Sequence, residues 1–177
     1  DNLRDATLHS TTYNGFGEET ITAIEAINII IEENFEKKSE ILGNQIKSGL
    51  NLLKEKYPNL LKDVRGLGCL QGIIINTDIT EKYLEPALKI IPIKFTKDKQ
   101  SIKKIIVSSI IFDLYHSHNI LTFYGSNIDI PLKVAPAIIA SKNDIDFFMD
   151  ALDKTLSKGL VKIVSNFVGK KIFSKLK

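Results

Sequence analysis

The sequence contains a single cysteine, Cys69, and no tryptophan. One cysteine excludes an internal disulfide and fits a reducing compartment, so we expect a cytoplasmic protein. No apolar run approaches the roughly 20 residues that a membrane-spanning helix needs, and no signal peptide opens the chain. The net charge is only +3, which argues against a dedicated nucleic-acid-binding protein.

The 177 residues suffice for one good core or two small ones, and their composition is ordinary for a globular protein. The first residue is Asp1 rather than methionine, and polar, motif-like sequence follows at once. We therefore expect the chain to be part of a longer protein.

Hydrophobic periodicity predicts two helices near the start. Isoleucines recur at helical spacing over 18–35, and a second apolar face runs over 36–56 until Pro58 ends it. The period then changes over 64–77, where glycines precede β-branched residues and predict one or two strands with a glycine-rich bend.

The second half predicts a helix, two short strands and another helix. The helix covers about 100–116, and the strands cover 120–124 and 130–135. Ser141–Asp144 resembles a helix-start box and leads into the last clear helix. This order is α+β or α/β, with helices packed on one side of a small sheet.

Hydroxyl side chains crowd the run HSTTYNGFGEE, at 9–19, directly before the first helix. Unpaired amides, the positive end of the helix dipole and serine or threonine hydroxyls together suit a phosphate. The alternative is a hydroxyl-rich turn that only caps the helix. The segment is not a Walker loop, because the terminal Gly-Lys-Ser/Thr is missing.

Other chemistry-bearing residues favour structural roles. The glycines of 66–72 suit a bent strand better than a dinucleotide loop, because no helix follows. Arg65 could bind an anion or brace a loop through a carboxylate. Cys69 is interpreted as a small core residue in an apolar strand. His116 and His118 have no third ligand nearby, so no metal site is expected.

Lys133 is unusual because it lies between apolar residues on a predicted strand, in PLKVAP. It could be an edge-strand lysine that faces water and discourages aggregation. Alternatively, it faces a cleft and receives a carboxylate.

The last 21 residues carry six lysines and no acidic residue, so the rest of the chain has a net charge of −3. The apolar residues Leu160, Ile163, Val164 and Phe167 share one helical face. Such a helix could lie on an anionic membrane surface. Alternatively, its apolar face covers the domain or a partner subunit.

Three segments together resemble the C-terminal part of class III aminotransferases, which are pyridoxal-phosphate enzymes of fold type I. Residues 9–30 are similar to the family's His-x-Ser-Thr-Tyr/Phe-x-Gly stretch before a long helix. Residues 63–73, DVRGLGCLQGI, resemble its Asp-Val-Arg-Gly-x-Gly-x-x-x-Gly-Ile strand entry, and LKVAPAII, 132–139, resembles Leu-Arg-x-x-Pro-Pro-Leu. The resemblance covers roughly 1–157 and does not explain the basic extension.

The resemblance implies a cofactor site shared between two subunits. In the family, the threonine directly before Tyr/Phe reaches across a dimer interface, where its hydroxyl and amide bind the phosphate of pyridoxal 5'-phosphate. The motif position implies Thr12, with Thr11 as an adjacent candidate, and it implies a homodimer. The Schiff-base lysine and the aspartate facing the pyridine nitrogen would precede Asp1, so no catalytic residue is expected in this chain.

Two departures from the family pattern concern the substrate. Lys133 stands where the family usually has an arginine that pairs with the substrate α-carboxylate, so the charge remains but the two-pronged geometry is lost. Phe16–Glu19 replaces the family's Asn-Pro. We expect a subgroup with distinct substrates, such as diamines or other terminal amines.

The expected organisation is the end of a large cofactor-binding domain at 1–55, a small C-terminal domain at 56–157 and a basic amphipathic extension at 158–177. The fold is α/β in the intact protein and α+β here, with a helical layer on a short, mainly antiparallel sheet. The implied reaction moves an amino group between a primary amine or amino acid and a 2-oxo acid. The alternatives are a non-catalytic dimerisation or binding domain and a domain held at membranes by its basic tail.

Overall fold

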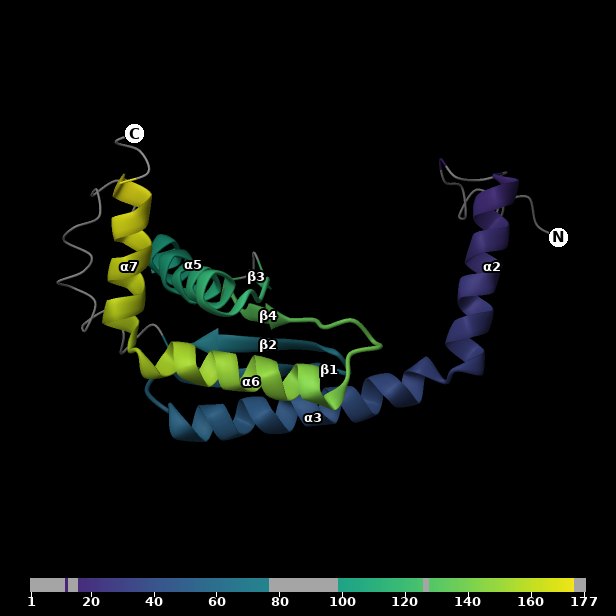
Figure 1. The fold of residues 1–177 in the computed structure, drawn as a ribbon, viewed down its shortest axis with the longest axis horizontal. Helices are drawn as coiled ribbons and strands as arrows, with labels where there is room; N and C mark the ends of the chain where they lie inside the picture. The colour runs from purple at the N-terminus through teal and green to yellow at the C-terminus, as the bar shows by residue number, and fades with distance from the viewer. Residues whose placement is uncertain (1–11, 13–15, 77–98, 126–127, 174–177) are drawn as a thin grey trace. The chain divides into compact units, whose positions relative to one another are not determined.

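The computed structural model describes residue 12 and residues 16–76, 99–125 and 128–173, without the side chains of residues 99 and 171–173 (Figure 1). The chain divides into two compact units, Asp1–Lys37 and Lys38–Lys177. In the first unit, α2 spans Gly17–Glu32. The helix ends three residues before the predicted position because Asn34 adopts a left-handed conformation with φ of 51°.

A four-stranded antiparallel sheet forms the centre of the second unit. Its strands are β1 (Leu61–Leu67), β2 (Leu70–Ile75), β4 (Leu132–Val134) and β3 (Phe123–Tyr124), in the order β1-β2-β4-β3. The strands predicted at 120–124 and 130–135 are confirmed over shorter spans. Because β4 lies between β2 and β3, the interpretation of Lys133 as an edge-strand residue is wrong.

Helices of the second unit share a single core with the sheet. They are α3 (Phe35–Lys56), α5 (Lys99–His118), α6 (Lys142–Ser157) and α7 (Leu160–Phe173). From the sheet, Ile73, Ile75, Leu132 and Val134 enter this core. Side chains alternate along a strand and directly paired residues share a face, so these four lie on one face of the sheet. The predicted helical layer on a short antiparallel sheet is confirmed.

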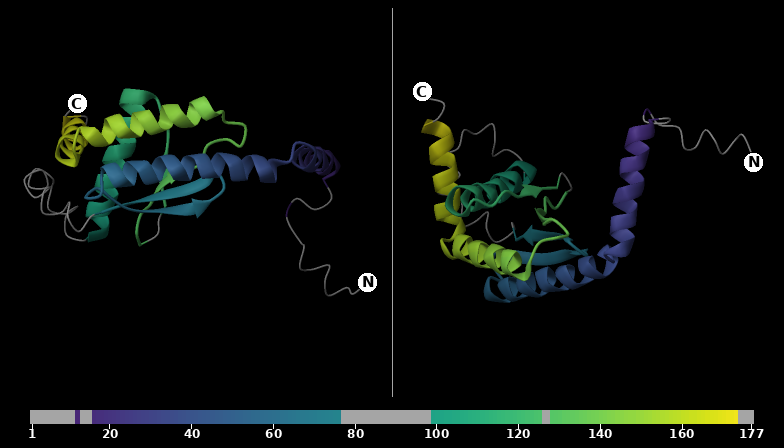
Figure 2. Two further views of the ribbon diagram at one scale, coloured as in Figure 1. Left: turned by 90° about the horizontal axis from the view of Figure 1, so that it is seen from below. Right: turned by 45° about the vertical axis from the view of Figure 1, so that its right-hand side comes forward.

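Helices α3 and α6 lie side by side and run in the same direction in all views (Figures 1 and 2). Gln45 Nε2 donates to the Lys142 carbonyl at 3.2 Å near the start of α6. Towards its end, Lys56 Nζ and Tyr57 Oη donate to Asp153 Oδ1 at 2.7 and 2.8 Å. The hydrogen bond from Lys56 holds the pKa of Asp153 below its usual range.

The β1–β2 turn lies directly on α3. A Cβ built on Gly43 would come within 2.4 Å of the Gly68 carbonyl oxygen, so only glycine permits this approach of the two backbones. Gly68 itself has φ of 52°. Cys69 belongs to this turn and is half-buried, with Sγ 4.0 Å from the Ser39 carbonyl oxygen. The prediction that it lies in a strand is therefore wrong, although it does pack against the core.

The basic extension folds back on the domain. Its helix, α7, packs against α5, and Leu160, Ile163 and Val164 are buried in the core. Burial of this face confirms the interpretation that it covers the domain. In the described ranges, every helix is too short or too polar to cross a bilayer.

Helix α6 begins at the capping box predicted from sequence. Ser141 Oγ accepts a hydrogen bond from the Asp144 amide at 3.2 Å, and Asp144 Oδ2 accepts one from the Ser141 amide at 2.8 Å. The Ser141 hydroxyl also donates to Asp144 Oδ2 at 2.6 Å, and this bond, together with the one from the Ser141 amide, holds the pKa of Asp144 below its usual range. Aspartate therefore performs the role usually given to glutamate at this position.

Candidate functional site

Four residues form a row across the sheet, one from each strand. Arg65 on β1 pairs with Gly72 on β2, Gly72 pairs with Lys133 on β4, and Lys133 pairs with Phe123 on β3. Directly paired residues point to the same face, and this face is opposite to that of Ile73 and the core. We call it the cleft face, defined by Arg65, Gly72, Lys133 and Phe123.

A cleft of about 310 Å³ opens on this face, between Arg65 and Lys133. Gly72 has no side chain, so the space between the side chains of Arg65 and Lys133 stays open. A Cβ built there would come within 3.3 Å of Pro131 Cβ, in a second wall of the cleft. A side chain at position 72 would therefore crowd the space that separates the two cations.

Arg65 is neutralised by its neighbours. Its Nε lies 2.7 Å from Asp63 Oδ2, and its Nη1 lies 3.1 Å from Asp129 Oδ2. The hydrogen bond from the guanidinium lowers the pKa of Asp63, and the same bond raises the pKa of Arg65. Of the two interpretations made from sequence, the brace through a carboxylate is the one observed. It ties the segment before β4 to β1.

Lys133 is half-buried, and in the described part of the chain no carboxylate lies within ion-pair distance of its ammonium. Its Nζ lies 5.2 Å from the centroid of the Phe123 ring, where the face of the ring attracts a cation. The backbone is also fixed, because Thr122 Oγ1 donates to the Lys133 carbonyl oxygen. The side chain therefore presents an uncompensated positive charge at a cleft, the arrangement that suits a ligand carboxylate.

Thr12 is the one described residue of the opening segment, and it is exposed in a turn. Thr11 lies outside the described residues. The cap position of α2 is taken by Phe16, whose side chain makes no cap hydrogen bond. Thr12 therefore does not occupy the cap position of α2.

His116 packs against an aromatic ring on its own helix. The ring of His116 lies 4.2 Å from that of Phe112, centroid to centroid. Among the residues with described positions, no three metal-binding side chains gather at one point.

Sequence reasoning missed Phe123 and Asp129 as neighbours of the site. Strand pairing places Phe123 opposite Lys133, and a tertiary ion pair joins Asp129 to Arg65. Neither contact is visible in the local sequence. An aromatic residue in the strand before PLKVAP was the only available signal for Phe123.

Residues 2–156 match the family model described as aminotransferase class-III. The chain therefore belongs to the class III aminotransferase family, and the resemblance seen in its three segments is confirmed. The match ends just before the basic extension, which was the limit expected from the sequence.

Curated relatives and solved structures agree with this assignment. Aminotransferase PigE of Serratia is 24% identical over 166 residues, which cover 81% of this chain and 19% of the relative. The mitochondrial alanine–glyoxylate aminotransferase 2 homolog 2 of Arabidopsis thaliana is 25% identical over 147 residues, covering 83% and 27%. The chain thus spans well under a third of the length of either relative.

Among solved structures, a transaminase from the marine bacterium Virgibacillus superposes with a TM-score of 0.63 at 18% identity, covering 90% of this chain and 31% of that one. Acetylornithine aminotransferase from Elizabethkingia anophelis gives a TM-score of 0.53 at 19% identity, covering 77% and 28%. At these identities the likeness shows the fold, which is that of fold type I transaminases.

Proposed function

We propose that the intact protein transfers an amino group between a primary amine or amino acid and a 2-oxo acid, and that Lys133 binds the substrate carboxylate. Family membership supports the reaction class. One observation supports the role of Lys133. The residue lies on a central strand and lines a cleft, and its ammonium has no described carboxylate partner. Arg65, in contrast, already pairs with two carboxylates of the protein.

The surroundings of Lys133 explain how one ammonium could hold a carboxylate. Half-burial reduces solvent screening, and the Phe123 ring restricts the flexible stem to one side of the cleft. A lysine offers a point charge with rotatable donors rather than the planar fork of arginine. Binding through Lys133 would therefore tolerate carboxylates at varied angles and would orient them less strictly.

Pyridoxal 5'-phosphate is the proposed cofactor, and the opening segment fits its phosphate. Thr12 is exposed and is not the cap of α2, so its hydroxyl can donate to a phosphate oxygen, with Thr11 as the adjacent candidate. The cofactor, when bound, supplies the electron-accepting ring that amino-group transfer requires. We further propose a homodimer in which Thr12 serves the partner's cofactor, with a large-domain segment at 1–55, a small domain at 56–157 and an extension at 158–177.

Substitution of Lys133 in the full-length protein separates carboxylate binding from chemistry. In Lys133→Gln, the KM for an amino acid and for a 2-oxo acid should rise about tenfold or more, since a charge-assisted hydrogen bond worth about 1.5–3 kcal/mol is lost. The KM for an amine without a carboxylate should stay within about twofold. Steady-state kinetics with both donors measures the difference.

Two further variants control this test. Lys133→Arg should keep the KM for carboxylate substrates low, because it preserves the charge. Lys47→Gln removes an exposed lysine of α3 and should change neither KM. Equal losses for the two donors in Lys133→Gln would show that Lys133 does not recognise a carboxylate.

Thr12→Ala in the full-length protein should weaken retention of pyridoxal phosphate by about tenfold, because one hydrogen bond to the phosphate is lost. Equilibrium dialysis followed by cofactor absorbance measures the affinity, and Thr12→Ser should restore it. The matched control is Thr22→Ala, since the Thr22 hydroxyl donates to the Glu18 carbonyl within α2. An unchanged affinity in Thr12→Ala would remove the phosphate role.

A further inference from the structure

A second cleft, of about 550 Å³, lies between α5 and α7. The polar stripe of α7 lines it with Lys162, Ser165, Asn166, Gly169 and Lys170. These positions recur every three or four residues, so they share one side of the helix. The stripe lies beyond residue 156, where the family match ends.

The opposite stripe of α7 fixes the helix in place. Leu160, Ile163, Val164 and Val168 are buried in the core. Phe167 is partly buried, and its ring lies 5.4 Å from that of Phe112 on α5, centroid to centroid. The lysines of the polar stripe are therefore carried by a packed helix.

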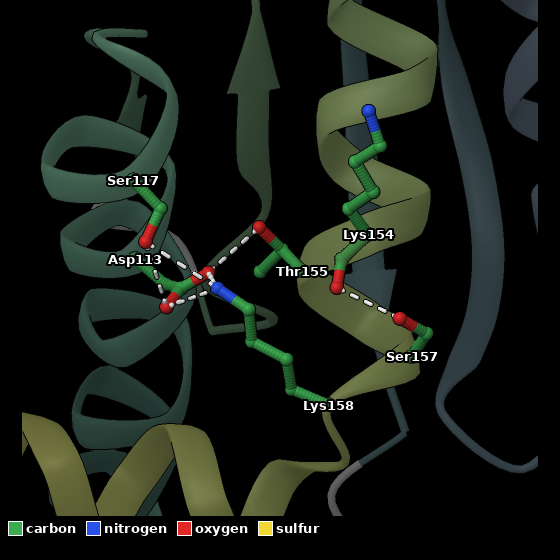
Figure 3. A network of polar contacts seen from close by, with 6 residues as sticks. All are labelled: Asp113, Ser117, Lys154, Thr155, Ser157 and Lys158. Carbon is green, nitrogen blue, oxygen red and sulfur yellow. Dashed lines mark hydrogen bonds and ion pairs between the residues drawn. The ribbon is translucent and has the colours of Figure 1, made fainter.

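The charge of the cleft is unbalanced. Its acidic residue, Asp113, is already bound by Lys158 Nζ at 2.7 and 2.9 Å and by the Thr155 hydroxyl at 2.9 Å (Figure 3). Lys162 and Lys170 have no carboxylate partner within the ranges that the structure describes. With the Asp113 and Lys158 charges cancelling, these two lysines leave the cleft with two positive charges.

Aromatic packing holds one of these lysines over the cleft. Lys170 Nζ lies 5.2 Å from the centroid of the Phe112 ring, and Phe112 also lines the cleft. The ring limits where the long side chain can extend. Ser165 and Asn166, which carry further hydrogen-bond donors, line the same cleft.

Gly169 also lines the cleft and adds no side chain to it. Glycine is the least favourable non-proline residue in a helix interior. A Cβ built on Gly169 meets nothing within 4 Å, so no described protein group requires the glycine. It leaves open the part of the cleft between Lys162 and Lys170.

We propose that this cleft binds a phosphate-bearing ligand. Its two uncompensated positive charges match a phosphate, which carries about −1.5 to −2 at neutral pH. Lysine ammonium groups suit phosphate as point charges, and the hydroxyl and amide of Ser165 and Asn166 add donors. The volume lies within the range of small-molecule sites. A soluble phosphate compound is favoured over a lipid headgroup, because the apolar stripe of α7 is buried.

The test is titration calorimetry of the full-length protein with inorganic pyrophosphate, after saturation with pyridoxal phosphate. Gly169→Leu adds a side chain to the cleft without changing any charge, and its Cβ would meet no atom within 4 Å. It should weaken pyrophosphate binding at least tenfold, while the melting temperature does not fall. Lys162→Gln and Lys170→Gln should each weaken it about tenfold.

Two controls that remove the same charge elsewhere test whether pyrophosphate binds at this cleft, rather than through the overall charge of the protein or at the proposed substrate site. Lys47→Gln and Lys133→Gln should leave the pyrophosphate affinity within about twofold. Binding to phosphatidylserine vesicles that is lost in Gly169→Leu and displaced by pyrophosphate would identify the source as a headgroup. The proposal is overturned if pyrophosphate does not bind, if Gly169→Leu binds it as well as wild type, or if every lysine substitution weakens it equally.

Discussion

Replacement of Gly43 by alanine is expected to lower the free energy of unfolding by about 3 kcal/mol, the upper end for overpacking a well-packed site. The new Cβ would lie 2.4 Å from the carbonyl oxygen and 2.6 Å from the Cα of Gly68. Both atoms are backbone, and the left-handed Gly68 is itself fixed in the β1–β2 turn. Relief would require α3 to move away from the turn, which would disturb the contacts of Leu42 and Ile46 in the core.

Urea unfolding of the full-length protein, followed by circular dichroism, measures this loss. Gly169→Ala is the matched control, because both glycines lie inside helices. Its Cβ meets open space, so the better helix propensity of alanine should stabilise the protein by about 0.5–1 kcal/mol. If Gly43→Ala costs less than about 1 kcal/mol, the close approach of α3 to the turn is not a feature of the folded protein.

Replacement of Lys158 by methionine is expected to cost about 2 kcal/mol, below the range for breaking a fully buried ion pair because the lysine retains some exposure. The side chains of Lys158 and Asp113 are 30% and 11% exposed. Without Lys158, the Asp113 carboxylate keeps the Thr155 hydroxyl as its nearest donor and loses its counter-charge. The pair also joins α5 to the end of α6, so its loss loosens the start of α7.

Lys154→Met provides the comparison. Lys154 pairs with Asp150 four residues earlier on α6, with both side chains more than half exposed at 62% and 57%. Such a surface pair contributes about 0.3–0.5 kcal/mol. In a double-mutant cycle, Asp113→Asn should recover part of the Lys158→Met loss, since no buried charge remains unpaired. Equal small effects of Lys158→Met and Lys154→Met in urea unfolding would contradict the buried pair.

Local signals made the helices and one cap predictable. The box of Ser141 and Asp144 depends on residues three apart, so its hydrogen bonds are encoded in four consecutive positions. The apolar stripe of α7 was also predictable, because helical spacing determines which residues share a face. The three family segments then gave the fold, which no single segment could specify.

Long-range contacts were not predictable from the sequence. Asp113 and Lys158 are 45 residues apart, and nothing in either neighbourhood indicates the other. The position of Lys133 on a central strand depends on β3 adding to the sheet beyond β4, and the pairing with Phe123 depends on strand register. The sequence of one strand does not determine which strands pair with it. For this reason the interpretation of Lys133 as an edge-strand residue remained open, and it proved wrong.

We propose that this chain is part of a pyridoxal-phosphate-dependent aminotransferase. Its most direct test is the intact mass of the full-length protein after borohydride reduction, which attaches the cofactor permanently to its lysine. We expect one pyridoxal phosphate adduct per chain. A reduced protein with no adduct, prepared with the cofactor in excess, would contradict the claim and leave a transaminase fold that serves as a binding or dimerisation domain.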